Sequence, residues 1–193
     1  MRHVALAERR LRNALVRGRL ALAPNPPPLD RDRALATAAA ADHILFLCLG
    51  NICRSPLAER YARRLLQAAG EDVEVDSAGF VAREGRRSPP DAVAAAARHG
   101  VDLSDHRSRR VRRAGVEASD VVFLMDVRNY RDFGRTFDPV DVEVYFLGSL
   151  ADTSDGFEIA DPAGEGPDAF DSSFADVTAA VDALVYEVVE RTA

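Results

Sequence analysis

The chain has 193 residues, of which 47% are hydrophobic and 29% are charged, which predicts one folded domain of ordinary size plus an additional segment. No apolar run approaches the ~20 residues of a membrane-spanning helix, and the basic N-terminus lacks the apolar stretch of a secretory signal, so we expect a cytoplasmic location. Residues 1–42 hold eight arginines and four acidic residues, a net charge of +4. Because the whole chain has a net charge of −6, residues 43–193 have a net charge of −10, which argues against nucleic-acid binding.

The first 42 residues form a basic extension, rich in Arg, Ala and Pro, that we expect to be helical or mobile. Residues 4–22 have leucines near one helical face, and the prolines of residues 23–28 end that helix in a stiff linker. A second alanine-rich stretch, residues 31–41, is also predicted to be helical. Two interpretations stay open for the extension: a loosely packed appendage, or a basic amphipathic helix that docks on a partner or an anionic membrane surface.

From His43 onward, short apolar runs alternate with segments of helical periodicity, which is the pattern of successive βαβ units. This predicts a three-layer α/β/α domain around a four-stranded parallel sheet of order 2-1-3-4, with ligands bound at the carboxyl ends of the strands. Ser88 is the expected N-cap of the second helix. The predicted strands are residues 43–48, 73–79, 121–125 and 142–148, and the predicted helices are residues 56–70, 88–100, 126–135 and 169–192.

The loop after the first strand, CLGNICRS at residues 48–55, combines the groups that phosphoryl transfer needs. A strand-to-helix loop points backbone N–H groups into one concavity at the positive end of a helix dipole, which is an anion site. Cys48 at this place is stabilised as a thiolate nucleophile, and Arg54 can clamp two phosphate oxygens with its planar fork. Ser55 can donate a hydrogen bond to the Cys48 sulfur. The predicted phosphate-binding residues are Leu49, Gly50, Asn51, Ile52, Cys53 and Arg54.

The structural alternative for this loop is a buried cysteine that only packs at the end of a strand. The context favours chemistry, because an apolar strand precedes the loop, a helix follows it, and Asn51 within it tolerates the left-handed backbone angles of a tight cradle. The reaction needs no cofactor and no metal ion, and none is predicted.

The stretch CLGNICRSP resembles the phosphate-binding loop of the low-molecular-weight protein tyrosine phosphatases, and DSAGF, GVDLSDHRSR, VVFLMDVRN and IADP follow in that family's order. The resemblance covers residues 43–193, which we interpret as a phosphatase domain. It implies a cysteinyl-phosphate intermediate and a phosphotyrosine-bearing protein substrate, with a bacterial tyrosine kinase as one candidate. It also implies that Asp161, in an Asp-Pro pair on a late loop, is the general acid. Asp138, in a second Asp-Pro pair, is a rival that precedes the fourth strand.

The resemblance also implies supporting roles for residues around the loop. Asn51, Ser77 and His106 are expected to form the polar network that fixes the loop's shape; the alternative is that each is a solvated turn residue. Asp126 directly follows the third strand and could either bond to groups of the loop or merely cap the next helix.

Cys48 and Cys53 are the two cysteines of the chain, which favours a reducing compartment over a disulfide scaffold. The resemblance implies that Cys53 can form a reversible disulfide with Cys48 and so spare it from irreversible oxidation. The alternative is that Cys53 is only a small loop residue.

The chain departs from the family pattern around the expected substrate pocket. An aromatic residue usually follows the Asp-Pro pair, and here Ala163 stands there, so selectivity for phosphotyrosine is in question unless Phe80 or Phe157 replaces the missing wall. The arginines of residues 83–87 favour an acidic substrate. Ile52 resembles phosphotyrosine-directed members, because phosphoarginine-directed members tend to carry threonine there.

Two other functions remain alternatives. Arsenate reduction on the same fold is disfavoured, because that chemistry needs cysteines beyond Cys53 and the chain has none. A weakly catalytic phosphate-binding module, recruited through the N-terminal extension, is the second alternative. The oligomeric state stays open.

Overall fold

The computed structural model describes residues 14–15, 18, 27–151, 153 and 156–192. Within these ranges, none of the helices has both the length and the apolar character that crossing a lipid bilayer requires. The strands are β1 (His43–Cys48), β2 (Glu74–Gly79), β3 (Val121–Leu124) and β4 (Glu143–Phe146). The helices are η1 (Pro27–Leu29), α2 (Arg31–Ala39), α3 (Arg54–Ala69), α4 (Pro90–Arg98), α5 (Arg113–Glu117), α6 (Val127–Phe137), η2 (Leu147–Leu150) and α7 (Pro167–Thr192).

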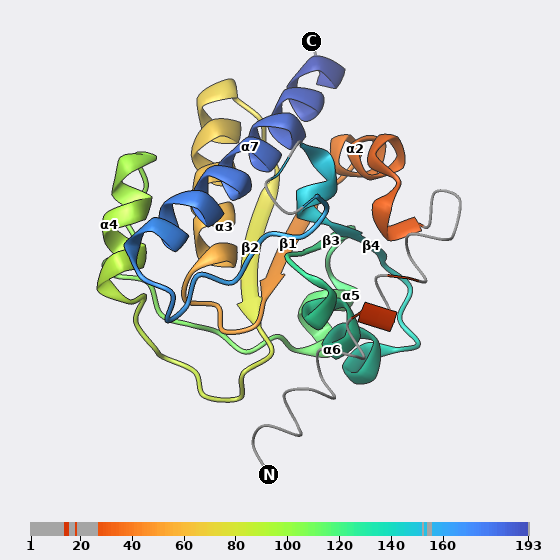
Figure 1. The fold of residues 1–193 in the computed structure, drawn as a ribbon. Coiled ribbons are helices and arrows are strands. Elements are labelled where there is room, and N and C mark those ends of the chain that lie inside the picture. Colours follow the sequence, from red (N-terminus) through yellow and green to blue (C-terminus); the bar gives the residue numbers. More distant parts are fainter. Residues whose placement is uncertain (1–13, 16–17, 19–26, 152, 154–155, 193) are drawn as a thin grey trace.

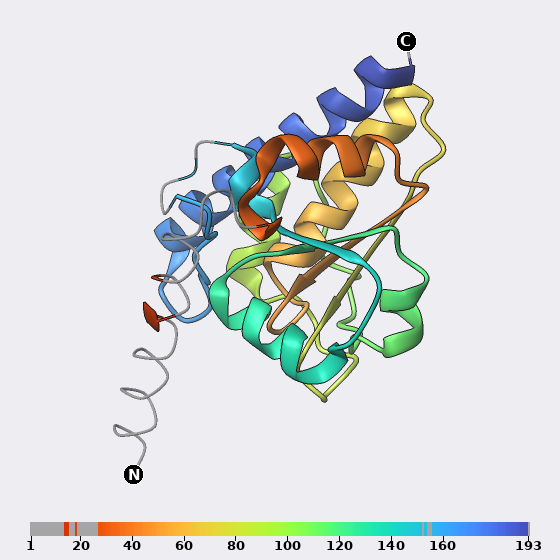
Figure 2. The same ribbon diagram turned by 90° about the vertical axis from the view of Figure 1, so that its right-hand side faces the viewer.

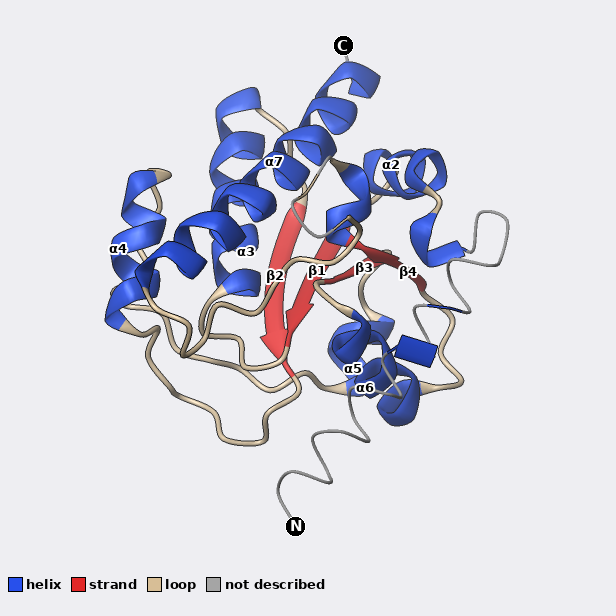
Figure 3. Cartoon of the chain, viewed as in Figure 1, coloured by secondary structure: helices blue, strands red, loops and turns tan. Residues whose placement is uncertain are grey.

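The four strands form one parallel sheet in the order β2-β1-β3-β4 (Figure 3). Strand β1 lies in the middle and is buried on both faces from Ile44 to Cys48, as expected of a parallel sheet covered by helices. The predicted sheet and its strand order are therefore confirmed.

Helices cover both faces of the sheet (Figures 1 and 2). Ile44 and Phe46 point into a core shared with α2, α3, α4 and α7. Leu45 and Leu47 point to the opposite face, into a core shared with α5 and α6. Alternate residues of one strand thus serve two separate cores, and the predicted three-layer architecture is confirmed.

The carboxyl ends of β1 and β2 reach the same edge of the sheet (Figure 1). The chain leaves β1 through α3 to its neighbour β2, and it returns through α4 and α5 to β3 on the other side of β1. The order of the strands therefore reverses beside β1, and a crevice for ligands opens at such a point. The loop that begins at Cys48 lies there.

Helix α2 confirms that the stretch 31–41 is helical, with its end at Ala39. Asp30 caps it by accepting a hydrogen bond from the amide of Arg33 at 3.1 Å. Its buried side chains belong to the same core as α7, and Arg31 Nε donates to the carbonyl oxygen of Leu150 at 3.0 Å. The buried residues of α2 are Ala34, Leu35 and Ala38. Of the predicted helix 4–22, the structure describes only residues 14, 15 and 18. Of the predicted linker 23–28, it describes only residues 27 and 28.

Several local predictions differ from the structure. Helix α3 begins at Arg54 rather than Pro56, because the phosphate loop runs directly into its first turn. Ser88 is not the N-cap of α4: Pro89 holds that position, and the buried Ser88 hydroxyl has no partner among the described residues. The short helix α5 was not predicted, and β4 ends at Phe146, where the turn η2 begins.

Candidate active site

The Cys48 sulfur lies at the end of β1, with 3% of the residue exposed. It accepts two hydrogen bonds, from the amide N–H of Asn51 at 3.2 Å and from the hydroxyl of Ser55 at 3.1 Å. The predicted contact between Ser55 and Cys48 is therefore present. Both donors stabilise negative charge on the sulfur, which suits a thiolate.

The loop between Cys48 and Arg54 presents a set of unbound amide groups. Among the described residues, the amides of Leu49, Gly50, Ile52 and Cys53 have no hydrogen-bond acceptor. The same loop ends at the N-terminus of α3, a helix of 16 residues whose dipole is positive at this end. A loop of free N–H groups at a helix N-terminus is suited to a phosphate group.

Arg54 is buried beside this loop, with 1% of the residue exposed. Its Nη1 donates to Asp126 Oδ2 and to the carbonyl oxygen of Ile159, both at 2.7 Å. Burial disfavours the charge, but Asp126 and Asp161 outweigh it and raise the pKa of Arg54, so the guanidinium is cationic. Its Nε is buried and has no partner among the described residues. A buried, unbound donor on a fixed cation is what an oxyanion in the loop would satisfy.

Asn51 organises the loop from its centre. Its φ of 49° is left-handed, as the sequence predicted for a tight cradle, and the residue is completely buried. The side-chain Nδ2 donates to Ser55 Oγ at 3.0 Å and to Ser77 Oγ at 2.8 Å. Its Oδ1 accepts from the amide of Arg109 at 2.8 Å. One side chain thus connects the loop, α3, β2 and the segment before α5.

Ser77 and His106 lie around Asn51, as the sequence predicted. Ser77 also donates to the carboxylate of Glu59, which is 6% exposed. His106 Nε2 lies 2.8 Å from the carbonyl oxygen of Asn51. Burial lowers the pKa of His106, so the neutral ring donates its Nε2–H to this oxygen. The structure therefore places all three residues in one buried network rather than in solvated turns.

Asp126 performs both of the actions that the sequence left open. Its Oδ2 accepts from Arg54, and its Oδ1 accepts from the amide of Asn129 at 2.8 Å, which caps α6. Because the same carboxylate holds Arg54 and starts α6, the end of β3 fixes the position of the guanidinium.

Asp161 lies on the loop before α7, with its Oδ2 3.3 Å from Arg54 Nη2. Its side chain is 38% exposed, in contrast to the buried Arg54. The loop is pinned on both sides, because Ile159 N donates to the carbonyl oxygen of Met125 at 2.8 Å and Ser173 Oγ donates to that of Ala160 at 2.9 Å. The rival Asp138 lies at the opposite end of α6 from Asp126.

Cys53 is 3% exposed, and both cysteines are free. Burial raises the pKa of Cys53, and the nearby charges of Cys48 and Asp161 add to this effect. Cys53 is therefore a neutral thiol.

The segment after β2 lies against the outer side of the loop. The amides of Phe80 and Val81 donate to the carbonyl oxygen of Leu49 at 3.0 and 3.1 Å, and the Arg86 guanidinium donates to that of Gly50. Phe157 does not replace the missing aromatic wall, because its ring packs on Phe146 with the centroids 4.9 Å apart. Phe80 is half-buried and packs against the same core.

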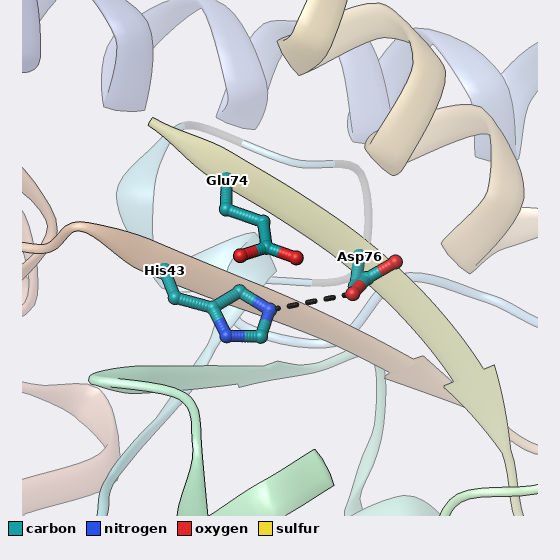
Figure 4. Close-up of side chains that lie close together, drawn as sticks. All are labelled: His43, Glu74 and Asp76. Carbon is teal, nitrogen blue, oxygen red and sulfur yellow. Dashed lines mark ion pairs between the residues drawn. The ribbon is translucent and has the colours of Figure 1, made fainter. Parts of the chain in front are cut away.

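Metal-ligating side chains gather elsewhere in the described part of the chain. His43, Glu74 and Asp76 lie together at the amino ends of β1 and β2, opposite to Cys48 (Figure 4). His43 Nε2 is 3.5 Å from Asp76 Oδ2, and Arg109 Nη2 is 2.9 Å from Asp76 Oδ1. Asp76 is paired with Arg109, and the cluster is separate from the loop.

Two site residues were missed from the sequence. Glu59 accepts from Ser77 inside the network, and Ser108 Oγ accepts from the amide of Arg86 at 3.0 Å, which ties the rim segment to the residues before α5. Glu59 could have been found from its spacing: it stands four residues after Ser55, so both side chains lie on the same face of α3. Ser108 carried no comparable signal.

Comparisons with known proteins agree with this geometry. A sequence model of the family described as "Low molecular weight phosphotyrosine protein phosphatase" matches residues 43–193. The probable low molecular weight protein-tyrosine-phosphatase EpsP of Ralstonia nicotianae is 34% identical over 142 residues, which cover 74% of this chain and 92% of that protein.

Solved structures resemble the chain over a similar span. The tyrosine phosphatase Wzb from Escherichia coli K30, in complex with sulphate, matches with a TM-score of 0.68 and 28% identity, covering 77% of this chain and 99% of that one. The arginine phosphatase YwlE, from Bacillus subtilis, matches with a TM-score of 0.68 and 25% identity, covering 76% and 95%. Because the family's sequence model runs from the first strand to the C-terminal helix, and EpsP covers most of that span, the chain belongs to the low molecular weight phosphotyrosine protein phosphatase family.

Proposed function

We propose that this phosphatase hydrolyses phosphotyrosine on proteins, with Cys48 as nucleophile, Arg54 as phosphate clamp and Asp161 as general acid. Three features that lie together at one edge of the sheet support this proposal. The Cys48 sulfur accepts two hydrogen bonds, the following amides are unbound, and the buried Arg54 Nε has no partner among the described residues.

In the first step, the Cys48 thiolate attacks phosphorus in line with the phenolic oxygen. A sulfur–phosphorus bond forms as the phosphorus–oxygen bond breaks. The loop amides and Arg54 stabilise the charge that spreads over the equatorial oxygens. Ser55, which already donates to the sulfur, stabilises the thiolate again when it leaves in the second step.

Asp161 protonates the departing phenolate in the first step. In the second step the resulting carboxylate takes a proton from water, which attacks the phosphocysteine and releases phosphate. Its partial exposure above the buried Arg54 suits a group that must reach both the leaving oxygen and water. The hydrogen bond from Ser173 to the carbonyl oxygen of Ala160 fixes the backbone beside Asp161.

Cys53 is proposed to protect the nucleophile. An oxidant such as peroxide converts the Cys48 thiolate to a sulfenic acid, and the Cys53 thiol then attacks that sulfur, forming a disulfide and releasing water. The raised pKa keeps Cys53 from competing as a nucleophile toward substrate. Peroxide followed by a thiol reductant should restore activity in the wild type but not in Cys53→Ala. Equal recovery in both would exclude this role.

The substrate class is tested by hydrolysis of phosphotyrosine, phosphoserine and phosphoarginine peptides side by side. We expect phosphotyrosine to be preferred, because Ile52 rather than threonine lines the loop, and we expect Cys48→Ser to remove turnover. Preferential release from phosphoarginine would move the chain toward the activity named for YwlE. Peptide binding without phosphate release by the wild type would instead support a binding module, and thioredoxin-coupled arsenate turnover would support a reductase.

The physiological substrate is proposed to be a tyrosine-phosphorylated protein, with a bacterial tyrosine kinase as one candidate. Residues 43–193 are proposed as the phosphatase domain, and residues 1–42 as an extension that adds α2 to its core and can dock on a partner or membrane surface. Comparing the localisation and partners of the full chain with those of a chain lacking residues 1–26, which keeps α2, tests the docking role.

A further inference from the structure

We propose that Arg86, with Arg83 and Arg87, forms a recognition site for carboxylates that flank the phosphotyrosine of the substrate. This proposal rests on the phosphatase function given above and names a class of substrate: peptides with Asp or Glu close to the phosphorylated residue. These three arginines are called the rim arginines below.

Arg86 is held at the mouth of the phosphate loop by several contacts. Its guanidinium donates to the carbonyl oxygen of Gly50, and its Nε donates to that of Arg83 at 3.2 Å. Its backbone is paired with Ser108 in both directions, through Ser108 Oγ at 3.0 Å and Ser108 N at 2.9 Å. A side chain fixed in this way loses little conformational freedom when it binds a ligand.

Arg86 has no ion-pair partner among the described residues. The same holds for Arg83 and Arg87, although Glu84 stands between Arg83 and Arg86 in the sequence. Glu84 is turned to a different partner, Arg112 Nη2, at 3.1 Å. Arg83 and Arg87 are exposed, whereas Arg86 is half-buried, so the group combines one fixed cation with two exposed ones.

The charges deeper in the site do not perform this task. Arg54 is already paired with Asp126 at 2.7 Å and with Asp161 at 3.3 Å, so its cation is balanced before substrate arrives. Residues 43–193 carry a net charge of −10, which repels acidic ligands. The rim arginines place positive charge beside the phosphate loop, because Arg86 donates to the carbonyl oxygen of Gly50.

The test uses two phosphotyrosine peptides that differ only in Glu against Gln at the flanking positions. We expect the full chain to hydrolyse the Glu peptide with kcat/KM at least about fivefold higher at about 0.05 M salt, and the ratio to fall at about 0.5 M salt. The ratio should approach one in Arg83→Gln/Arg87→Gln, which changes only exposed side chains, and in Arg86→Gln. The matched control is Arg135→Gln, an exposed arginine near the end of α6, which should keep the wild-type ratio.

Binding of the same peptides to Cys48→Ser measures recognition without turnover. Equal affinities for the two peptides, or a preference for Glu that survives both arginine variants, would overturn the proposal. Failure of the wild type to hydrolyse either peptide would count against the proposed phosphatase function instead, and the ratio of affinities would still decide whether the rim arginines recognise carboxylates.

Discussion

Asp161 lies 3.3 Å from Arg54, so the proposed acid and the proposed phosphate clamp are in contact before substrate binds. The contact joins two segments that are far apart in the sequence, the turn after β1 and the loop before α7. A phosphate held by Arg54 therefore has the Asp161 carboxyl beside it, where the leaving oxygen must be protonated.

Asp161→Asn is predicted to lower kcat by about 10²- to 10⁴-fold, because the phenolate must then leave without a proton. The loss should be smaller for aryl phosphates with acidic phenols, which need less help to leave. Steady-state kinetics over a series of such substrates checks this dependence. The matched control, Asp138→Asn, changes the other Asp-Pro pair and should retain activity; a comparable loss there would contradict the assignment.

Asn51 offers a pair of variants that separates its side chain from its backbone. Asn51→Gly loses the hydrogen bonds to Ser55 and Ser77 but still adopts the φ of 49°, whereas Asn51→Ala adds strain of about 1–2 kcal/mol. We expect both variants to be less active than wild type and Asn51→Ala to unfold at lower denaturant concentration than Asn51→Gly. The reverse order of stability would show that the backbone conformation is not constrained.

Protonation of His106 is predicted to destabilise the fold. Burial is the largest cause that lowers the pKa of His106, with Arg60 and Arg109 adding to it and Glu59 and the bond to Asn51 opposing it. The folded pKa is therefore below the unfolded value of about 6.5, and the folded state binds fewer protons. The stability that the neutral ring contributes should be fully present above the unfolded pKa. It should be lost as pH falls through the folded pKa.

Denaturant unfolding between about pH 7 and pH 5 measures this loss. His106→Gln, which cannot titrate, should lose less stability over the same interval than wild type. Parallel curves for wild type and His106→Gln would mean that the ring does not carry the effect.

Leu35→Ala is predicted to lower the free energy of unfolding by about 2–4 kcal/mol. The reason is that the Leu35 side chain of α2 is buried in the core to which α7 also contributes. Asp32→Ala, at an exposed position of the same helix, should change it little. Chemical denaturation of the full chain provides the measurement. An unchanged midpoint for Leu35→Ala would show that α2 is only loosely attached.

The sheet and the phosphate loop could be predicted because their signals are local. Apolar runs such as residues 43–48 identify buried strands by themselves, and Cys48 through Arg54 form a continuous motif. Glu59 and Ser108 could not be identified in the same way, since their roles depend on partners distant in the chain. The packing of α2 was likewise underestimated: Ala34 and Ala38 share one face, but alanine carries little hydrophobic signal, and the core that they enter is completed by α7.

Trapping of the covalent intermediate shows whether Cys48 is the nucleophile. Asp161→Asn is mixed with an aryl phosphate whose phenol is acidic, so that the first step proceeds without a general acid. The second step, which needs the Asp161 base, is slowed. The reaction is then quenched in acid and the protein is digested for mass spectrometry. We expect a phosphoryl group on Cys48 and none in the double variant Cys48→Ser/Asp161→Asn under the same conditions. Phosphate release without a phosphorylated Cys48, or turnover that survives Cys48→Ser, would contradict this expectation.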